Sequence, residues 1–571
     1  MKKSDRIILF IFTILLIFFL GKILLPFSNY MFDFHDESQP TRVYEFVQNI
    51  KNMHIPPRLA PDYSFKLGLP VFNFYAPFSY WITSIINLIG FDIADSLKLS
   101  FLLAFVIAFS GFFKFLRLFF TLSASLVGAA LYVSSPWIAV ETFIRGDLGE
   151  VWFIALFPWA LTLLYKNSVS NSRVVFISTA LITSFVLTSH NILSLIGSIL
   201  LFIFILFFKN RFKNLAAFFL AFLISAYFLI PAFFELGLVR AQEIASGINF
   251  NDHFVCWKQL WSSPWDYGFS LPGCNDGLSF MLGKMQIIFG AAGLLAFIGS
   301  YFYKKITKLK IGLYIFIITI VSIFFTTYTS APVWRILKPS LLQFPWRLLA
   351  FGLFGLSFFA GYCFSLLKEN KLNKILLILL TLFILFFNSK FFTKFQFTKN
   401  VFYQRVLAPV YLYQRVAYKV SEYLPKTVNY SEWLKLEVKA AKGPNIDKTI
   451  GDNFVIYPLD KKPFKVLSNQ EFYKEVQTKS QKFLINVHYF PFWKILINNQ
   501  KYNVVKTDSL GRPIIEANSN NLNIKIFYAQ TRIELIGNII TILGLASLVI
   551  IYFWRRGPTN SVASKVTINS D

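Results

Sequence analysis

"PFSYWITSIINLIG", residues 77–90, decides how this chain is threaded through a membrane. The segment is apolar, but as an α-helix its 14 residues would measure about 21 Å at roughly 1.5 Å per residue. The hydrocarbon core of a bilayer is about 30 Å thick, so a helix of this length does not reach across it. We therefore expect residues 77–90 to lie flat at the membrane interface.

The rest of the chain is apolar enough for a polytopic membrane protein. Of its 571 residues, 55% are hydrophobic and 19% aromatic, and the mean hydropathy is +0.55, more than the core of a soluble domain requires. The first apolar run has no small-residue cleavage site after it, so we expect a transmembrane helix there rather than a secretory signal. Twelve runs are candidate spans: 7–28, 97–118, 121–140, 150–165, 174–189, 191–208, 215–235, 284–303, 311–330, 346–367, 374–390 and 532–554.

The charges of the loops test this topology, because lysine and arginine accumulate on the cytoplasmic side of short loops. If residues 77–90 do not cross, every basic cluster between closely spaced spans falls on one face. If they cross, the N-terminus stays inside and all later clusters move outside. The sequence therefore predicts twelve spans with both termini cytoplasmic. The clusters are Lys2, Lys3 and Arg6; Lys114 and Arg117; Lys166 and Arg173; Lys209, Arg211 and Lys213; Lys304, Lys305, Lys308 and Lys310; Lys368, Lys371 and Lys374; Arg555 and Arg556.

The formal net charge of +27 is explained by these clusters and by one late polar block. A basic protein of this kind meets the positive-inside rule, so we do not expect nucleic acid as a partner. The expected surroundings are membrane lipid.

The fold class that follows is an α-helical polytopic membrane protein with a small β-rich domain outside the membrane. Residues 391–531 are polar and, with about 140 residues, long enough for an independent domain. Their end alternates β-branched and aromatic runs with turn signals such as "DSLGRP" and "NSNN", which predicts antiparallel strands. The expected division is a transmembrane domain at 1–390 with outer loops at 29–96, 141–149 and 236–283, the β-rich domain at 391–531, the last span at 532–554 and a disordered cytoplasmic tail at 555–571.

Ionisable residues gather at the outer ends of the predicted spans. Charged side chains near a membrane are retained mainly where they pair with another charge or take part in function, so a functional site is expected here. "FDFHDESQPTRVYEF" at 32–46 and "FIRGDLGEVW" at 143–152 are the two densest stretches. The residues concerned are Asp33, His35, Asp36, Arg42, Arg58, Asp62, Arg145, Asp147, Glu150, His190, Glu235, Arg240 and Arg347.

This mixture of groups suits transfer chemistry. A carboxylate can take a proton from an acceptor hydroxyl, while arginines, with or without a divalent cation, can hold a phosphate leaving group. Carboxylate oxygens without a nearby cysteine pair suit Mg²⁺ or Mn²⁺ better than zinc. The candidate metal ligands are Asp36 and Glu150, with Asp147 as a further second-loop acid.

Structural roles also explain several of these residues. Asp36 is suited to cap the helix after the first span, and Arg42 to pair with Glu45 on its surface. Arg145 and Glu150 are equally suited to form an ordinary interfacial salt bridge.

Other groups in the outer loops leave two interpretations open. His190 fits a hydrogen-bonded residue at a helix end at least as well as a ligand. Cys256 and Cys274 share one loop, and they either form a disulfide, if the loop faces an oxidising side, or remain free thiols.

Several stretches resemble the GT-C superfamily of polyprenyl-phosphate-dependent membrane glycosyltransferases. More closely, the chain is similar to the bacterial multipass proteins grouped as YfhO-like or "6-pyruvoyl-tetrahydropterin synthase related". The resemblance runs across the whole membrane region. The matching pieces are "HDESQPTR", "IPPRLAPDYSFKLGLPVFNFYAP", "IRGDLGE", "PAFFELGLV", "SSPWDYGFSLPGCNDGLSFMLG", "LQFPWRLL" and, near the end, "HYFPFWKILINNQKYNVV".

The resemblance implies roles for individual residues. GT-C enzymes carry an acidic residue in the first outer loop, followed by interfacial helices, which agrees with a flat segment at 77–90. Asp36, with His35 beside it, maps onto the loop-one catalytic acid. Glu150 or Asp147 maps onto the second-loop acid that assists metal or phosphate binding.

The function expected from the residues and the resemblance together is an inverting glycosyltransferase. It would move a sugar from a polyprenyl-phosphate carrier to an extracytoplasmic glycan, lipid or protein. Asp36 would be the catalytic base, and the donor phosphate would be held by Arg58, Arg145 and Arg347, with Arg42 beside them. The enzyme would lie in the cell membrane of a bacterium, with its active site and residues 391–531 outside.

Two other classes stay open. A lipid-linked oligosaccharide flippase or other transporter would carry ionisable residues deep within several spans and broken helices at mid-membrane. An inactive cell-envelope scaffold would tolerate the joint loss of Asp36, Arg58 and Arg145.

Overall fold

The computed structural model describes residues 3–26, 30–247, 249–302, 309–337, 343–393, 397–399, 420–441, 450, 455–519 and 521–553. The predicted tail at 555–571 and the basic residues Lys304, Lys305 and Lys308 lie outside these ranges.

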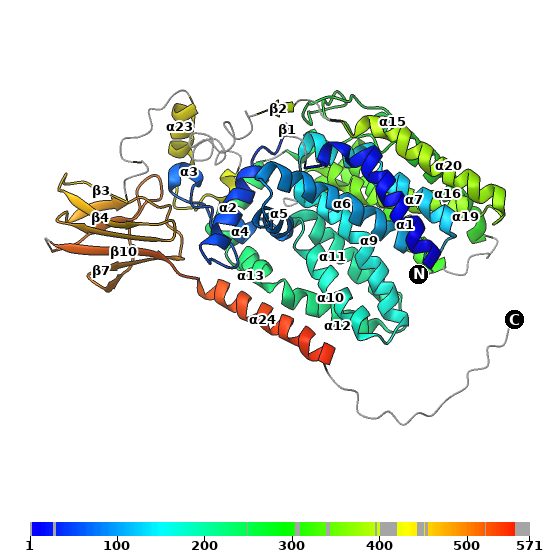
Figure 1. Ribbon diagram of the computed structural model, residues 1–571. Helices are drawn as coiled ribbons and strands as arrows, with labels where there is room; N and C mark the ends of the chain where they lie inside the picture. The colour runs from blue at the N-terminus through cyan, green and yellow to red at the C-terminus, as the bar shows by residue number, and fades with distance from the viewer. Residues whose placement is uncertain are drawn as a thin grey trace.

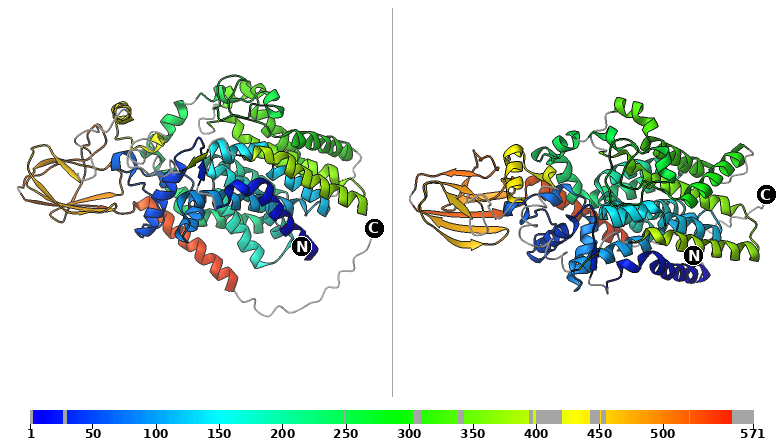
Figure 2. Two further views of the ribbon diagram at one scale, coloured as in Figure 1. Left: turned by 45° about the horizontal axis from the view of Figure 1, so that its top comes forward. Right: turned by 90° about the horizontal axis from the view of Figure 1, so that it is seen from above.

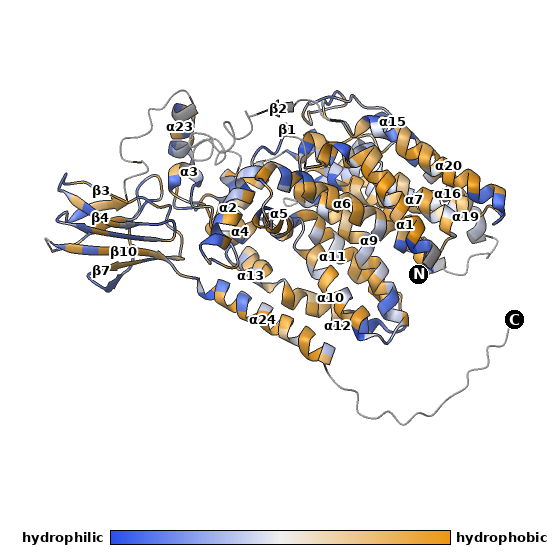
Figure 3. Cartoon of the chain, in the orientation of Figure 1, coloured by the Kyte–Doolittle hydropathy of each residue, from blue (hydrophilic) through white to orange (hydrophobic). Residues whose placement is uncertain are grey.

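A body of packed helices makes up most of the chain, and a region of strands stands at one end of it (Figure 1). Hydropathy separates the two parts, since apolar residues dominate the helices and polar residues are far denser among the strands (Figure 3). The long apolar helices are α1 (Lys3–Leu16), α6 (Ile93–Leu116), α7 (Leu122–Val133), α8 (Pro136–Val140), α9 (Leu148–Val169), α10 (Arg173–Leu187), α11 (Asn191–Leu206), α12 (Arg211–Ile224), α13 (Ala226–Phe234), α16 (Lys284–Phe302), α17 (Leu309–Thr326), α19 (Leu349–Ser365), α20 (Lys371–Asn388) and α24 (Arg532–Phe553).

These helices coincide with the predicted apolar runs. By length and composition, seven described segments can cross a membrane, and α12 with α13, bent by 69° at their junction, would make an eighth. Four shorter apolar helices fall on four other predicted spans. The chain is therefore mostly helical with at least seven membrane-capable segments, and the count of twelve stays a prediction.

The stretch at 77–90 forms α5 (Phe78–Leu88), a helix of 11 residues. Such a helix is about 16 Å long, half of the hydrocarbon thickness, and it is not among the membrane-capable segments of the described residues. Tyr80 on its inner face is fully buried, whereas Ile85 and Ile89 are exposed. One face of α5 thus packs on the protein, as expected for a helix that does not cross.

The first loop contributes further short elements around α5. They are β1 (Tyr30–Phe32), α2 (Gln39–Lys51), α3 (Tyr63–Lys66) and α4 (Val71–Phe74). The third loop carries α14 (Ala241–Gly247) and α15 (Trp257–Trp261), and α18 (Ala331–Leu337) lies between α17 and α19.

The strands confirm the predicted antiparallel β-region. A five-stranded sheet has the order β4-β5-β10-β7-β8 and a three-stranded sheet the order β3-β6-β9, and every pairing is antiparallel. Figure 2 shows both sheets beyond the end of the helical body. The strands are β3 (Ile456–Pro458), β4 (Phe464–Asn469), β5 (Tyr473–Thr478), β6 (Lys482–Ile485), β7 (Trp493–Ile497), β8 (Gln500–Tyr502), β9 (Ile514–Glu516) and β10 (Leu522–Tyr528), with helix α23 (Tyr430–Ala441) beside them.

Strand pairing and a continuous chain both connect the later part of the molecule to the helical body. Strand β1 of the first loop pairs antiparallel with β2 (Phe397–Lys399). Strand β10 leads into α24, which runs back along α13 (Figure 1). The first loop is consequently enclosed between the helical body and the strands.

Candidate functional site

The first loop lies directly against the second loop. The backbone N–H of His35 donates to the carbonyl of Ile144 at 2.8 Å, and that of Asp36 donates to the carbonyl of Arg145 at 3.0 Å. Gly146 permits this approach, because it has a φ of +65° and a Cβ there would come within 2.3 Å of the Phe34 ring. A side chain at this position would push the two loops apart.

Asp36 projects from the start of the first loop and is surrounded by side-chain donors. Its carboxylate accepts from the Ser38 hydroxyl, from Gln39 Nε2 at 2.7 Å and from Arg42 Nη1 at 3.1 Å. These are side-chain bonds, so Asp36 does not act through its carboxylate as a simple backbone cap of α2. The side chain remains 26% exposed, which leaves room for one further contact.

Arg42 pairs with Asp36 and not with Glu45. Its Nη1 also donates to the Tyr80 hydroxyl at 3.2 Å, and its guanidinium lies over the ring of Tyr75 at 4.2 Å. Tyr80 belongs to α5, so the flat helix supports the arginine that faces Asp36.

The second loop gathers three carboxylates around Arg145. The guanidinium donates to Glu141, to Asp147 Oδ2 at 3.1 Å and to Glu150 Oε1 at 3.1 Å. Asp147 also caps α9, since its Oδ1 accepts from the backbone N–H of Glu150 at 2.9 Å. The predicted salt bridge between Arg145 and Glu150 therefore exists, as one part of a larger cluster.

Glu150 is the centre of this cluster and is completely buried. Its Oε1 accepts a second guanidinium bond from Arg347 Nε at 2.9 Å. Arg347 reaches in from the turn before α19 and also donates through Nη1 to Gln343 Oε1 at 2.9 Å. Residues far apart in the chain thus meet at one carboxylate.

His190 lies beside Glu150, with Nε2 3.7 Å from Oε1. Its Nδ1 accepts from the backbone N–H of Leu193 at 3.1 Å and so caps α11. Because burial lowers the pKa of His190, the ring is neutral, and Nδ1 as acceptor places the proton on Nε2. His190 is therefore the helix-end residue expected from the sequence and presents an N–H to Glu150.

The carboxylates fit a divalent cation better than the histidine does. One ligand atom of each of Asp147, Glu150 and His190 lies within 4.8 Å of the others, but His190 Nε2 carries a proton. Glu150 Oε2 is buried with no hydrogen-bond partner among the described residues. Carboxylate oxygens of this kind suit Mg²⁺ or Mn²⁺, so Glu150 and Asp147 are the residues that would hold the ion.

His35 points away from this chemistry and into the third loop. Its ring stacks on Phe269 at 4.5 Å and meets the edge of Tyr267 at 4.6 Å. Cys256 and Cys274 form a disulfide, with their Cα atoms 5.7 Å apart, and close the loop that carries these rings. The open question about the two cysteines is thus resolved in favour of the disulfide.

Arg58 belongs to a different network. It donates through Nη1 to Asn73 Oδ1 at 3.1 Å and through Nη2 to Asn538 Oδ1 at 2.9 Å, and Asn538 lies on α24. The structure therefore brings together Asp36, Arg42, Arg145, Asp147, Glu150 and Arg347, which we call the site network. Arg58 bonds to none of these residues in the described part of the chain.

Several residues that contact or surround this site were not predicted from the sequence. Glu141 stands four residues before Arg145, the spacing of an ion pair on one helix face, and that signal could have revealed it. Trp346, whose ring lies 4.3 Å from the Arg145 guanidinium, gave no signal beyond being aromatic. Glu422 lies within electrostatic range of Arg42 and Asp36, and burial raises its pKa to about 7.

The sequence profile of one protein family matches residues 72–397, more than half of the chain. The family is described as a 6-pyruvoyl-tetrahydropterin synthase related domain of membrane proteins. The chain belongs to this family of membrane proteins, as the resemblance in its sequence implied.

Among solved structures, the chain is similar to the arabinofuranosyltransferase AftD from Mycobacteria, with 12% identity and a TM-score of 0.42 over 68% of this chain and 26% of that one. It is also similar to the oligosaccharyltransferase of Archaeoglobus fulgidus, with 12% identity and a TM-score of 0.41 over 68% of this chain and 56% of that one. The chain thus spans about a quarter and just over half of the lengths of these two proteins. Likenesses this remote say nothing about activity, and no curated protein matches the chain.

Proposed function

We propose that this membrane protein is an inverting glycosyltransferase that uses a polyprenyl-phosphate sugar as donor. The single observation that carries the proposal is the junction of the first and second loops. Two backbone hydrogen bonds, one from His35 and one from Asp36, hold the first loop against the second, so that the partly exposed Asp36 carboxylate lies beside a buried cluster of arginines and acids.

In the proposed reaction Asp36 acts as general base. It takes the proton of the acceptor hydroxyl while that oxygen forms a bond to C1 of the sugar. The bond from C1 to the phosphate oxygen breaks on the opposite face, and the polyprenyl phosphate leaves with the electron pair. The bonds from Ser38 and Gln39 hold the Asp36 carboxylate in one orientation.

The arginines divide into two roles. All the side-chain hydrogen bonds described for Arg145 go to three carboxylates, so this arginine holds the acids together. Arg347 keeps its Nη2 group, and Arg42 its Nη2 and Nε groups, without a hydrogen bond to the described residues. These free N–H groups are the ones we assign to the leaving phosphate, where they would stabilise the charge that develops.

A divalent cation, when bound by Asp147 and Glu150, would add positive charge for the phosphate. The capacity for one lies in Glu150 Oε2, which is buried without a hydrogen-bond partner among the described residues. Arg58 has no part in this scheme.

We place the site and residues 391–531 on the outer face of a bacterial cell membrane. The basic loops support this sidedness through the positive-inside rule. The disulfide between Cys256 and Cys274 supports it independently, because disulfides persist in oxidising compartments.

The test is transfer by the purified protein in liposomes. Polyprenyl-phosphate sugars and nucleotide sugars are offered in parallel, each with and without EDTA, and the release of the carrier is measured. We expect turnover only with the lipid-linked donors and loss of turnover in the Asp36→Asn variant. Movement of an intact lipid-linked sugar between leaflets without bond cleavage would instead identify a flippase.

A further inference from the structure

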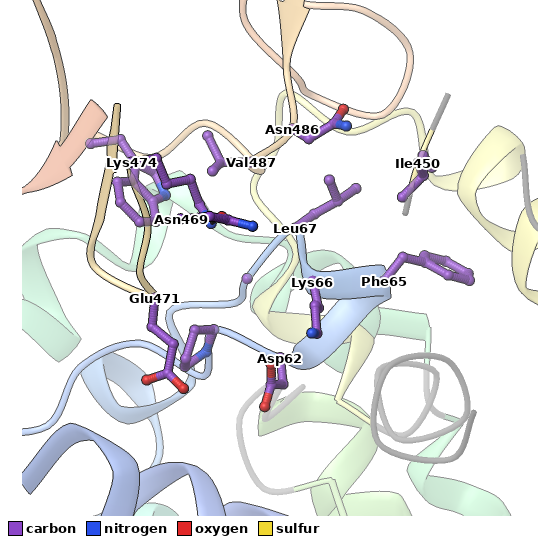
Figure 4. A pocket seen from close by; sticks show the side chains of 13 residues that line it. Asp62, Phe65, Lys66, Leu67, Ile450, Asn469, Glu471, Lys474, Asn486 and Val487 are labelled. Carbon is purple, nitrogen blue, oxygen red and sulfur yellow. Dashed lines mark hydrogen bonds between the residues drawn. The ribbon is translucent and has the colours of Figure 1, made fainter. Parts of the chain in front are cut away.

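A polar cavity of about 240 Å³ lies at the seam between the first loop and the strand region (Figure 4). Its volume is below the roughly 300–1,000 Å³ of drug-sized ligand sites, so it suits a small ligand. Loop one supplies residues between 61 and 68, and the strand region supplies residues between 469 and 493 as well as Ile450. The cavity exists only because the two parts of the chain meet.

The two walls carry balanced charges. Asp62 and Lys66 line the loop-one side, and Glu471 and Lys474 the strand side (Figure 4). Lys474 Nζ donates to Asn469 Oδ1 at 2.9 Å. Burial and then the nearby charge of Lys66 lower the pKa of Lys474 to about 8, while burial and then Asp62 raise that of Glu471. Like charges thus face each other across the seam, and the set as a whole is neutral.

Trp493 forms an aromatic part of the wall. Its side chain is only 4% exposed, and its indole N–H has no hydrogen-bond partner among the described residues. A buried donor without a partner is costly, which points to a ligand atom that accepts from it.

The loop-one wall is built on an unusual turn. Ser64, Phe65 and Lys66 all have positive φ, of 55°, 61° and 62°, although none is glycine. Such conformations persist only where the surroundings impose them, and they cluster at functional sites.

His488 and Trp433 impose this turn from the strand side. His488 Nδ1 donates to the Leu510 carbonyl at 2.7 Å, and Nε2 accepts from the Ser64 hydroxyl at 2.7 Å. The Trp433 indole donates to Ser64 Oγ at 2.9 Å. Burial lowers the pKa of His488 to about 3, so the ring is neutral, as its two hydrogen bonds require.

One wall of the cavity contacts α2, the helix that carries Arg42 of the site network. Glu45 Oε2 accepts from the backbone N–H of Asp62 at 3.5 Å, and Arg42 stands three residues earlier on the same helix. Three residues correspond to about 4.5 Å of helix rise. The loop that forms one wall of the cavity therefore contacts the helix that carries Arg42.

We propose that this cavity is a saccharide-binding site, which holds one sugar unit of a neutral glycan. Sugar hydroxyls both donate and accept, so one ring can pair with carboxylates, ammonium groups, an amide and the Trp493 N–H together. A wall with as many carboxylates as ammonium groups gives no advantage to a phosphate or another anion. The inference goes beyond the transfer proposed above, since glycan binding can be measured without any turnover.

The experiment is a titration of the full-length protein in nanodiscs, followed by saturation-transfer NMR. The probes are maltotriose and the N-acetylglucosamine trimer, with glycylglycine and inorganic phosphate as the zwitterionic and anionic alternatives. We expect saturable binding of at least one of the two oligosaccharides. Trp493→Phe removes an N–H that no described group needs, so the fold should persist, and binding should weaken at least tenfold.

Glu471→Gln should weaken binding in the same way, while two matched changes outside the cavity, Trp257→Phe and Glu516→Gln, should leave it unchanged. The proposal is wrong if neither oligosaccharide binds, if Trp493→Phe and Glu471→Gln bind as the wild type does, or if glycylglycine or phosphate binds more tightly than both. An inactive transferase that still binds the oligosaccharide would overturn the proposed function and leave this inference standing.

Discussion

Two buried networks of arginine and carboxylate side chains, both rooted in the first loop, differ in what they have left to bind. The site network joins Asp36, Arg42, Arg145, Asp147, Glu150 and Arg347. The second, which we call the anchor network, consists of Arg58, Asn73, Glu235, Thr531, Glu534 and Asn538. It ties the first loop to the end of α13 and to α24.

In the anchor network every carboxylate oxygen is used. Glu235 accepts from Thr531 Oγ1 at 2.5 Å and from Asn73 at 3.4 Å. Glu534 accepts from Asn73 at 2.7 Å, from the Thr531 backbone at 2.8 Å and from Tyr528 at 3.3 Å. Buried polar groups that satisfy one another in this way fix a structure.

In the site network several groups remain open. Glu150 Oε2 is buried without a partner among the described residues, and so is Oε1 of Glu141, which lies beside the network and bonds to Arg145. The Asp36 side chain is partly exposed. The difference lies in the carboxylates and not in the arginines, because Arg58 Nε of the anchor network is also buried without a partner among the described residues.

The largest expected effect is on activity and comes from Asp36→Asn. Loss of a general base costs about 10²–10⁴-fold in rate, and the amide oxygen can still accept from Gln39 and Arg42. We therefore expect transfer to fall by that factor while the thermal midpoint of the protein in detergent changes little. Asp252→Asn, a partly exposed carboxylate in the third loop, is the control. Full activity of Asp36→Asn would remove Asp36 from the reaction.

The next effect is on stability and comes from Glu150→Gln. The substitution leaves Arg145 and Arg347 buried with one carboxylate fewer, and breaking a buried ion pair costs about 3–5 kcal/mol. Thermal unfolding and the yield of monodisperse protein should both decrease. Glu432→Gln on the exposed face of α23 should change neither, and an equally stable Glu150→Gln protein would show that the cluster is not held by this carboxylate.

The sequence predicted the helices well because hydropathy is a local property. Each apolar run is helical, although the runs 121–140 and 215–235 are each divided between two helices. The shortness of 77–90, together with the loop charges, separated α5 from the spans. The meeting of "FDFHDESQPTRVYEF" with "IRGDLGE" agrees with the sequence-based expectation, because the loop charges predict that both stretches lie on one face of the membrane.

The partners of the arginines were not predictable in the same way. Arg58 and Arg145 look alike in sequence, but Arg58 bonds to Asn538, 480 positions further along the chain. Neutral amides leave no charge pattern, and the docking of α24 on α13 is a long-range packing event. The left-handed turn at 64–66 contains no glycine, so the sequence did not predict it.

Arg58→Met tests the anchor side of the comparison and has a smaller expected effect. The change leaves the side-chain oxygens of Asn73 and Asn538 without their donor, which costs about 1–3 kcal/mol for each buried group that stays unpaired. The thermal midpoint should therefore decrease. Transfer per folded molecule should stay within twofold of the wild type, and Arg335→Met, at an exposed arginine, is the matched control. If a folded Arg58→Met protein loses turnover specifically, Arg58 binds the donor phosphate after all.

Glu422 lies in a 3₁₀ turn at Ser421–Tyr423, before β3 in the chain, and it tests whether a group outside the first two loops titrates within the site network. Its neighbour Tyr423 packs against Phe74 and Tyr75 at 6.2 and 6.3 Å between ring centres, and Tyr75 is the ring covered by Arg42. Burial raises the pKa of Glu422 to about 7, above its value in an unfolded chain. The folded state therefore binds the proton more tightly, and the stability that this supplies is complete below about pH 4.5 and is lost as the pH rises through 7.

Between pH 6 and pH 8 the free energy of unfolding should decrease by about 1.4 kcal/mol because of Glu422. Hydrogen exchange of the backbone around 421–424 should consequently speed up over this interval by about tenfold, because a neutral carboxyl is replaced by a buried charge. Glu422→Gln, which stays neutral at every pH, should abolish the acceleration, and Glu432→Gln should preserve it. The exchange rates at 421–424 are first corrected for the intrinsic pH dependence of exchange. If the corrected rates of the wild type do not change from pH 6 to 8, Glu422 is in contact with solvent and does not titrate as part of the site network.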